Sequence, residues 1–364
     1  MIVPIEYVTV AQLAPLPYFA APFGMTMART KIDTSVERKE VNGFQFPLGV
    51  YPIESLEPKP GYTVDFEPAD GGESAGDWEE WPDRYMFDIV APANRIRSLC
   101  RAFFALLPSR VYPILDMLGE DAFREVDPYI AYDPAPLDRF LDLVHRHKDW
   151  LFEDGLVGFG AMSEDPFLYV YIDEHKIVTV RAEARLRERI EKVLDAFDIS
   201  PIETLLGADA AAHEHRSVLS TNSESLLEEE ILEELIEQWR LQLNVDRESN
   251  VDDAGRDLGV TCWRCLLRAQ PSPMSAPMYA QVWLRASNMD EAETLAFDAL
   301  ASSAGVDFEV EGATGLMVLA DRISPEVFTQ SITDINGAAI ADDIEAIGVF
   351  AIRIVEADQS SDGS

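Results

Sequence analysis

The chain has 364 residues, 66 of them acidic and 29 of them lysine or arginine, which gives a formal net charge of −37. A charge of that sign and size repels phosphate backbones and anionic lipid surfaces, so we expect neither nucleic acid nor a membrane as a partner. Hydrophobic residues make up 47 % of the chain and aromatic residues 10 %, which is enough for packed cores in two or three domains.

The acidic excess has two explanations. It reflects either a host that favours acidic, lysine-poor proteins or a specific basic partner, and its spread through every segment favours the host explanation. The N-terminus lacks a basic region before its apolar residues, and no run reaches the ~20 apolar residues of a membrane span. Three cysteines do not make a disulfide framework. We therefore expect a cytoplasmic, reduced protein.

Residues 1–82 are punctuated by proline and glycine and predict a loop-rich N-terminal region. Within it, the pattern indicates strands at Ile5–Val10 and Phe44–Val50. The acidic, glycine-containing segment Glu67–Asp83 is typical of an exposed loop or linker.

Residues 83–200 predict an α+β domain with helices on one face of a mixed sheet. Its strongest pattern is a meander of three strands followed by a charged helix with apolar residues three and four apart. In chain order, we expect strands at Arg84–Val90, Arg110–Leu118, Leu156–Met162, Pro166–Ile172 and Ile177–Arg181, and helices at 94–107, Leu137–Leu151 and Ala182–Phe197.

Residues 201–257 predict a connector that contains an acidic amphipathic helix from Ser225 to Leu243. Ser225 and Glu228 fit a capping box at its start. Leucine, isoleucine and tryptophan residues four apart form an apolar stripe, and glutamates occupy the opposite side.

Residues 258–357 predict a ferredoxin-like α+β domain of order βαββαβ, preceded by an extra strand at Val260–Ala269. The expected strands are Tyr279–Ala286, Val306–Val310, Leu316–Ala320 and Val349–Val355, and the expected helices are Asn288–Ala304 and a broken one over 324–347. Residues 358–364 are expected to be a disordered tail. The fold class is thus α+β, with two layered sheet-plus-helix domains.

Two motifs resemble metal or redox sites but have poor geometry. Cys262 and Cys265 form a CxxC within a predicted strand, where residues three apart point to opposite faces. His145 and His147 lie in a predicted helix, where residues two apart are ~200° apart around the axis. Neither pair can bind one ion together.

A third motif, His213-Glu214-His215, lies in a stretch without a clear pattern. If the backbone is extended there, both imidazoles share one face. Asp209 or Glu214 is a possible third ligand, but no spacing fixes it. We favour surface histidines, and we expect no metal and no cofactor.

Asp173, Glu174 and His175 are the preferred candidates for a binding site. They lie between two predicted strands, and a carboxylate beside a histidine suits acid–base work. The simpler interpretation is a polar hairpin turn, because aspartate favours turns.

Glycines and aromatics near the meander have structural explanations. Gly155, Gly158 and Gly160 lie within a strand with no helix start after them, so close backbone packing is favoured over phosphate binding. Phe167, Tyr169 and Tyr171 alternate on one strand face, which we expect to be buried under a helix rather than to stack bases.

These observations identify no catalytic residues, and three functions are considered. The favoured hypothesis is a non-catalytic binding protein, an acidic adaptor, inhibitor or immunity-like protein whose surface meets a basic protein. The alternative is a small-molecule-sensing regulator, which depends on fold analogy. Less favoured is a metal-dependent hydrolase that uses His213, His215 and nearby carboxylates.

Overall fold

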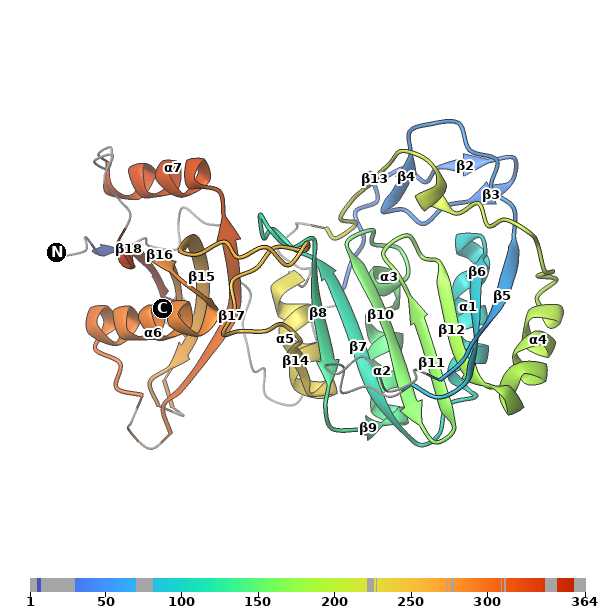
Figure 1. Cartoon of the computed structure of the whole chain (residues 1–364). Helices are drawn as coiled ribbons and strands as arrows, with labels where there is room; N and C mark the ends of the chain where they lie inside the picture. Colours follow the sequence, from blue (N-terminus) through green and yellow to red (C-terminus); the bar gives the residue numbers. More distant parts are fainter. Residues whose placement is uncertain are drawn as a thin grey trace, which may run out of the picture. The chain divides into compact units, whose positions relative to one another are not determined.

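The computed structural model describes residues 5–7, 30–69, 81–220, 226, 228–272, 274–275, 278–308, 310, 312–337 and 346–356. The chain divides into a central unit, Ala21–Leu118 with Asp127–Asn244, and a C-terminal unit, Met1–Ala20 with Gly119–Val126 and Val245–Ser364. Each unit combines helices with a largely antiparallel sheet, so the expected α+β class holds at this level (Figure 1). The expected tail, the expected linker over 70–80 and the capping residue Ser225 lie outside the described residues.

The central unit is built on a nine-stranded sheet of order β14-β8-β7-β10-β11-β12-β6-β5, with β9 paired to β7. Its strands are β5 (Gly61–Glu67), β6 (Arg84–Val90), β7 (Arg110–Leu118), β8 (Val126–Ala131), β9 (Ala135–Pro136), β10 (Val157–Glu164), β11 (Phe167–Ile172), β12 (Val178–Glu183) and β14 (Leu241–Leu243). Two small sheets join β2 (Glu40–Val41) to β3 (Phe44–Gln45), and β4 (Val50–Pro52) to β13 (His213–His215).

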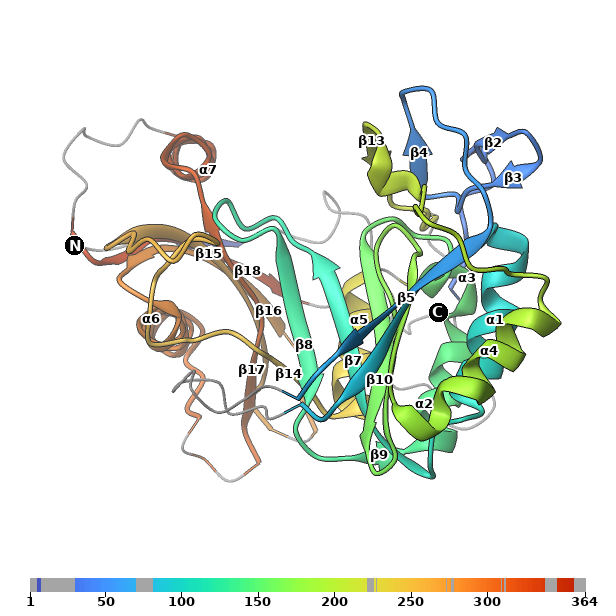
Figure 2. The same ribbon diagram turned by 45° about the vertical axis from the view of Figure 1, so that its right-hand side comes forward.

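Five helices pack on one face of this sheet (Figure 2). They are α1 (Ala93–Phe104), α2 (Leu137–Arg146), α3 (Lys148–Leu151), α4 (Arg187–Ala196) and α5 (Glu228–Trp239), with short 3₁₀ turns at Ala184–Leu186 and Ala208–Ala210. Alternate strand residues such as Leu168, Val170 and Ile172 meet them in one continuous core. The expected arrangement of helices on one sheet face is therefore present.

The same alternation corrects the interpretation of the aromatic strand face. Because Leu168 and Val170 face the helices, Tyr169 and Tyr171 lie on the opposite face, and both are half-buried. Trp81 contacts Phe167 and Tyr169 there. The tyrosines are therefore not buried under a helix.

The acidic helix is shorter than its sequence pattern. α5 ends at Trp239, and Arg240 has a φ of +58°, which turns the chain into strand β14. Ile231, Leu235 and Trp239 of its apolar stripe are fully buried in the central core. The stripe thus stabilises the central unit itself.

The C-terminal unit has a five-stranded sheet of order β1-β18-β16-β15-β17. Its elements are β1 (Ile5–Tyr7), β15 (Thr261–Gln270), β16 (Met278–Ala286), α6 (Met289–Ala304), β17 (Thr314–Ile323), α7 (Pro325–Asn336) and β18 (Gly348–Glu356). Helices α6 and α7 lie on the two sides of this sheet (Figure 1, Figure 2). Each ends at a glycine in the left-handed conformation.

The expected ferredoxin-like order is not confirmed. Residues 305–308 and Val310 form no strand, so the predicted hairpin before Leu316 is missing from the described residues. Instead β15 lies between β16 and β17 and pairs with both. Cys262 and Cys265 lie in β15, buried and unpaired.

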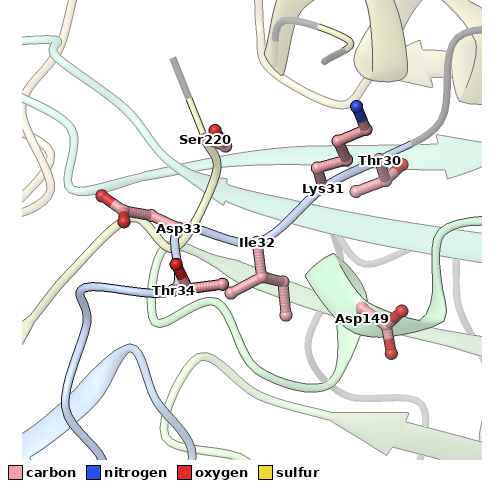
Figure 3. Close-up of a pocket in the computed structure, with 7 residues that line it drawn as sticks. All are labelled: Thr30, Lys31, Ile32, Asp33, Thr34, Asp149 and Ser220. Carbon is pink, nitrogen blue, oxygen red and sulfur yellow. The ribbon is translucent and has the colours of Figure 1, made fainter. Parts of the chain in front are cut away.

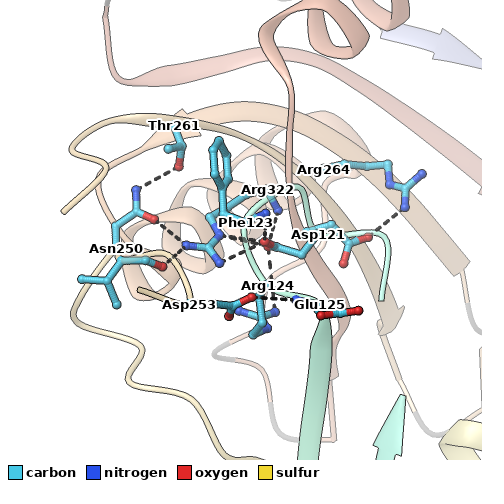
Figure 4. Close-up of polar contacts among 11 residues, drawn as sticks. Asp121, Phe123, Arg124, Glu125, Asn250, Asp253, Thr261, Arg264 and Arg322 are labelled. Carbon is cyan, nitrogen blue, oxygen red and sulfur yellow. Dashed lines mark hydrogen bonds and ion pairs between the residues drawn. The ribbon is translucent and has the colours of Figure 1, made fainter. Parts of the chain in front are cut away.

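A buried ion pair holds the segment Gly119–Val126 in the C-terminal unit (Figure 4). The guanidinium of Arg322 donates to both carboxylate oxygens of Asp121, at 2.9–3.1 Å, and to the Asn250 side chain at 3.1 Å. The Asp121 carboxylate also accepts the backbone N–H of Arg322 at 2.8 Å. These hydrogen bonds offset the desolvation cost of burying the two charged side chains.

Among the described helices, none combines the length and apolar character that crossing a bilayer requires.

Candidate metal centre

Three histidines from distant parts of the sequence converge in the central unit. His213 and His215 lie on strand β13, and His175 lies in the turn between β11 and β12. Their imidazole rings are 4.7–4.8 Å apart, centroid to centroid, and each pair is nearly perpendicular. The cluster joins the preferred binding-site candidate to the His213-Glu214-His215 motif.

Strand β13 is extended, so His213 and His215 share one face and Glu214 points to the other. The strand pairs antiparallel with β4, where His215 lies opposite Val50. Glu214 is exposed and pairs with Arg216. Glu214 therefore is not part of the cluster.

A close crossing of two glycine backbones holds the end of β13. Arg216 donates its N–H to the Gly49 carbonyl at 2.8 Å, and Gly155 donates to the Arg216 carbonyl at 3.1 Å. A Cβ on Gly155 would lie 2.1 Å from the Gly49 oxygen, so only glycine fits. Buried Asp154 next to it accepts the N–H of Val218 at 2.8 Å. These contacts fix the position of His215.

The turn that carries His175 is built by its own residues. Asp173 accepts the N–H of Ile177 on its side chain at 2.7 Å and the N–H of Lys176 on its carbonyl at 3.1 Å. Lys176 has a φ of +63°, is 2 % exposed, and donates from Nζ to the Val157 carbonyl. Burial lowers the pKa of Lys176 to about 8. The expected polar turn is thus present, and it orients His175.

The Nε2 atoms of the three rings point toward one another. Nε2 of His213 lies 2.9 Å from Nε2 of His175 and 3.0 Å from Nε2 of His215. Two nitrogens bound to one zinc ion at about 2.0–2.1 Å would lie about 3.3 Å apart in a tetrahedron. Movements of a few tenths of an ångström would therefore admit an ion.

The opposite nitrogen of each ring contacts an acceptor. Nδ1 of His213 lies 2.7 Å from the Ala211 carbonyl, and Nδ1 of His215 lies 2.6 Å from the Gly155 carbonyl. Nδ1 of His175 lies 3.2 Å from the Glu174 carboxylate. Since these oxygens only accept, each Nδ1 carries a proton, and the lone pair of a neutral ring is then on Nε2.

Three neutral rings in this arrangement would direct three lone pairs at one point, which is unfavourable without a cation among them. Burial lowers the pKa of His175, but hydrogen bonds to Asp173 and Glu174 outweigh it and raise that pKa to about 10. Burial lowers the pKa of His215. Without metal, a proton on His175 thus supplies the positive charge.

The nitrogen set suits a first-row transition metal such as Zn²⁺, because imidazole binds these ions well, whereas Mg²⁺ and Ca²⁺ prefer oxygen ligands. Hydrogen bonds from Nδ1 to a carboxylate or carbonyl are the usual outer contacts of metal-bound histidine. The His175 side chain is 16 % exposed and Glu174 is 24 % exposed, so solvent reaches the cluster. The cluster therefore lies near the protein surface.

All three histidines were candidates from the sequence, but in two separate motifs. Asp209 and Glu214, the expected alternatives for a third ligand, are both exposed. The third ring is His175, which is 38 residues before His213. They meet because the chain at Gly155 is bonded to β13, through the Gly155 N–H to the Arg216 carbonyl and through Nδ1 of His215 to the Gly155 carbonyl.

The glycines Gly158 and Gly160 have the expected packing role. A Cβ on Gly158 would lie 2.2 Å from the hydroxyl of Tyr171, and that hydroxyl donates to Asp116 on β7. The absence of a side chain at Gly158 lets the tyrosine ring cross strand β10, and a Cβ on Gly160 would lie 2.2 Å from the Val170 carbonyl oxygen.

Comparisons with protein-family models, with curated proteins and with solved structures found no match to this chain.

Proposed function

We propose that the central unit binds one transition-metal ion, zinc by preference, through Nε2 of His175, His213 and His215. The observation that carries this proposal is the convergence of the three Nε2 atoms while all three Nδ1 atoms donate to fixed acceptors. That arrangement sets the ring orientation and the tautomer that metal binding needs.

Three protein ligands with one open position are typical of catalytic zinc sites, whereas structural zinc sites have four protein ligands. A zinc ion here would lower the pKa of a bound water and polarise a carbonyl or phosphoryl oxygen. We therefore propose hydrolysis as the reaction class. Glu174, hydrogen-bonded to His175, would hold the ligand in place rather than bind the ion.

The test of metal binding is a zinc titration of chelator-stripped protein, purified without a histidine tag, against a chromogenic chelator. The expected result is one equivalent for the wild type and for Glu214→Ala, and loss of that equivalent in His213→Ala and His215→Ala. Glu214 is the matched control because it lies between the two ligands and points away. Less than ~0.2 equivalents in the wild type would refute a site of useful affinity.

Hydrolysis is tested separately with zinc-loaded and stripped protein on a panel of carboxylic and phosphoric esters. Activity that follows zinc occupancy and disappears in His213→Ala supports the reaction class. A zinc-loaded protein without activity above free zinc refutes hydrolysis while leaving metal binding in place.

A further inference from the structure

A second constellation of reactive side chains lies in the central unit, on residues that the metal centre does not use. The hydroxyl of Thr30 lies 2.7 Å from Nδ1 of His147, and Nε2 of His147 lies 2.9 Å from a carboxylate oxygen of Glu234. The other oxygen of Glu234 pairs with Arg146. A hydroxyl, an imidazole and a carboxylate are thus connected in series.

The protonation of this series follows from its ends. The carboxylate only accepts, so Nε2 of His147 donates to Glu234, and the lone pair on Nδ1 accepts the hydroxyl proton of Thr30. The His147 side chain is 0 % exposed, and the Glu234 side chain, at 26 %, is partly exposed. The two hydrogen bonds thus run in the same direction as in a nucleophile–base–acid relay, in which the carboxylate orients the imidazole and stabilises its cation.

The elements that hold the relay are well connected. His147 lies between α2 and α3, with its N–H bonded to the Leu143 carbonyl at 2.9 Å, and Glu234 lies on α5. The segment after Thr30 pairs with residues 218–220, through Asp33 N–H to the Val218 carbonyl at 2.8 Å. The three groups therefore come from separate segments that tertiary contacts position.

Thr30 also lines a cavity of about 620 Å³ (Figure 3). Its other lining residues are mostly polar and carry both signs of charge: Lys31, Ile32, Asp33, Thr34, Asp149 and Ser220. The volume lies within the ~300–1,000 Å³ of small-molecule sites. This mostly polar lining suits a small polar molecule such as an ester of a short carboxylic acid.

We propose that Thr30 is a nucleophile that takes the acyl group of a small polar carboxylic ester. In the first step the Thr30 Oγ–carbon bond forms, the carbon–alkoxide bond breaks, and the hydroxyl proton passes through His147 Nδ1 to the leaving alcohol. In the second step water attacks the acyl-threonine, one water proton passes through His147 back to Oγ, and the carboxylic acid leaves. No metal or redox partner takes part.

The test is covalent labelling by a fluorophosphonate, which forms an Oγ–phosphorus bond as fluoride leaves. Because Arg29 and Lys31 flank Thr30, the site is mapped by mass spectrometry with a protease other than trypsin. All samples contain a chelator. The expected result is one adduct at position 30 in the folded wild type and in Thr30→Ser. No adduct is expected in Thr30→Val or in unfolded protein.

The relay itself is tested with Glu234→Gln, which keeps a carbonyl oxygen for His147 but removes the charge. The labelling rate should fall at least about tenfold. The same kind of substitution in a serine-protease triad lowers activity by ~10⁴-fold. Absence of an adduct at Thr30 in the wild type, or equal rates in the wild type and Glu234→Gln with both folded by circular dichroism, would overturn the proposal. The chelator separates this outcome from failure of the metal centre.

Discussion

Zinc should raise the melting temperature of the central unit, and the size of the increase can be worked out. A ligand that binds only the folded state at 100 times its dissociation constant stabilises it by about 2.7 kcal/mol. A unit spanning Ala21–Leu118 and Asp127–Asn244 falls in the size range where 1 kcal/mol moves the midpoint by about 2–4 °C. The expected increase is therefore roughly 5–10 °C.

The perturbation is His213→Ala, because the Nε2 of His213 lies within 3.0 Å of both partner rings. Its loss leaves two ligands, so the zinc-dependent increase should fall to near zero. Glu214→Ala is the matched control on the same strand and should keep the full increase. The assay is thermal unfolding by circular dichroism at pH 7.5, with and without zinc.

The net charge of −37 attracts divalent cations without any specific site, so magnesium at the same concentration is the second control. Magnesium should give little increase, because it prefers oxygen ligands. The zinc effect should also weaken as the pH falls from 7.5 to 5, because zinc must displace protons from the imidazole nitrogens, including the proton that the raised pKa keeps on His175. Equal increases in His213→Ala and Glu214→Ala, or with magnesium and zinc, would refute a three-histidine site.

Three further predictions concern stability and reactivity. Asp121→Ala should destabilise the C-terminal unit by about 3–5 kcal/mol in urea unfolding, because Arg322 stays buried without its carboxylate. The exposed Asp253 accepts one hydrogen bond of 3.3 Å from the Glu125 N–H, so Asp253→Ala should cost at most about 1 kcal/mol. Gly155→Ala should cost about 1–3 kcal/mol and weaken zinc binding, because the new methyl meets the Gly49 carbonyl; unchanged zinc affinity would contradict that link. Burial raises the pKa of every cysteine thiol, so a thiol reagent at pH 8 should modify the three cysteines only after unfolding; rapid modification of the native protein would contradict the buried positions.

Hydrophobic periodicity alone was sufficient to predict the strands and helices in which it is strong. The alternation over Pro166–Ile172 predicted β11, and the three-and-four spacing before Trp239 predicted α5. Alternation does not say which face the helices cover, and that is why Tyr169 and Tyr171 were assigned to the wrong environment. Leu243 fits the helical spacing of α5, but pairing with β8 places it in strand β14.

The same limit explains the C-terminal unit. Residues 306–310 alternate apolar and acidic residues as a strand would, yet the described ones form no strand, and β17 pairs with β15 instead. Pairing between distant strands decides the sheet order, and no local pattern reports it. The expected partner for the glutamate face of α5 stays a prediction, although the apolar stripe of that helix is already buried in the central core.

The candidate site shows why a structural and a functional interpretation of one motif need not compete. From the sequence, a polar turn at Asp173 and a binding site at His175 were alternative interpretations of one segment. In the structure the turn positions the ring: Asp173 closes it through the N–H groups of Lys176 and Ile177, and Glu174 accepts from Nδ1 of His175. A turn closed by its own aspartate holds its neighbours in fixed orientations. The residues that make the turn ordinary are therefore those that would let His175 serve as a metal ligand.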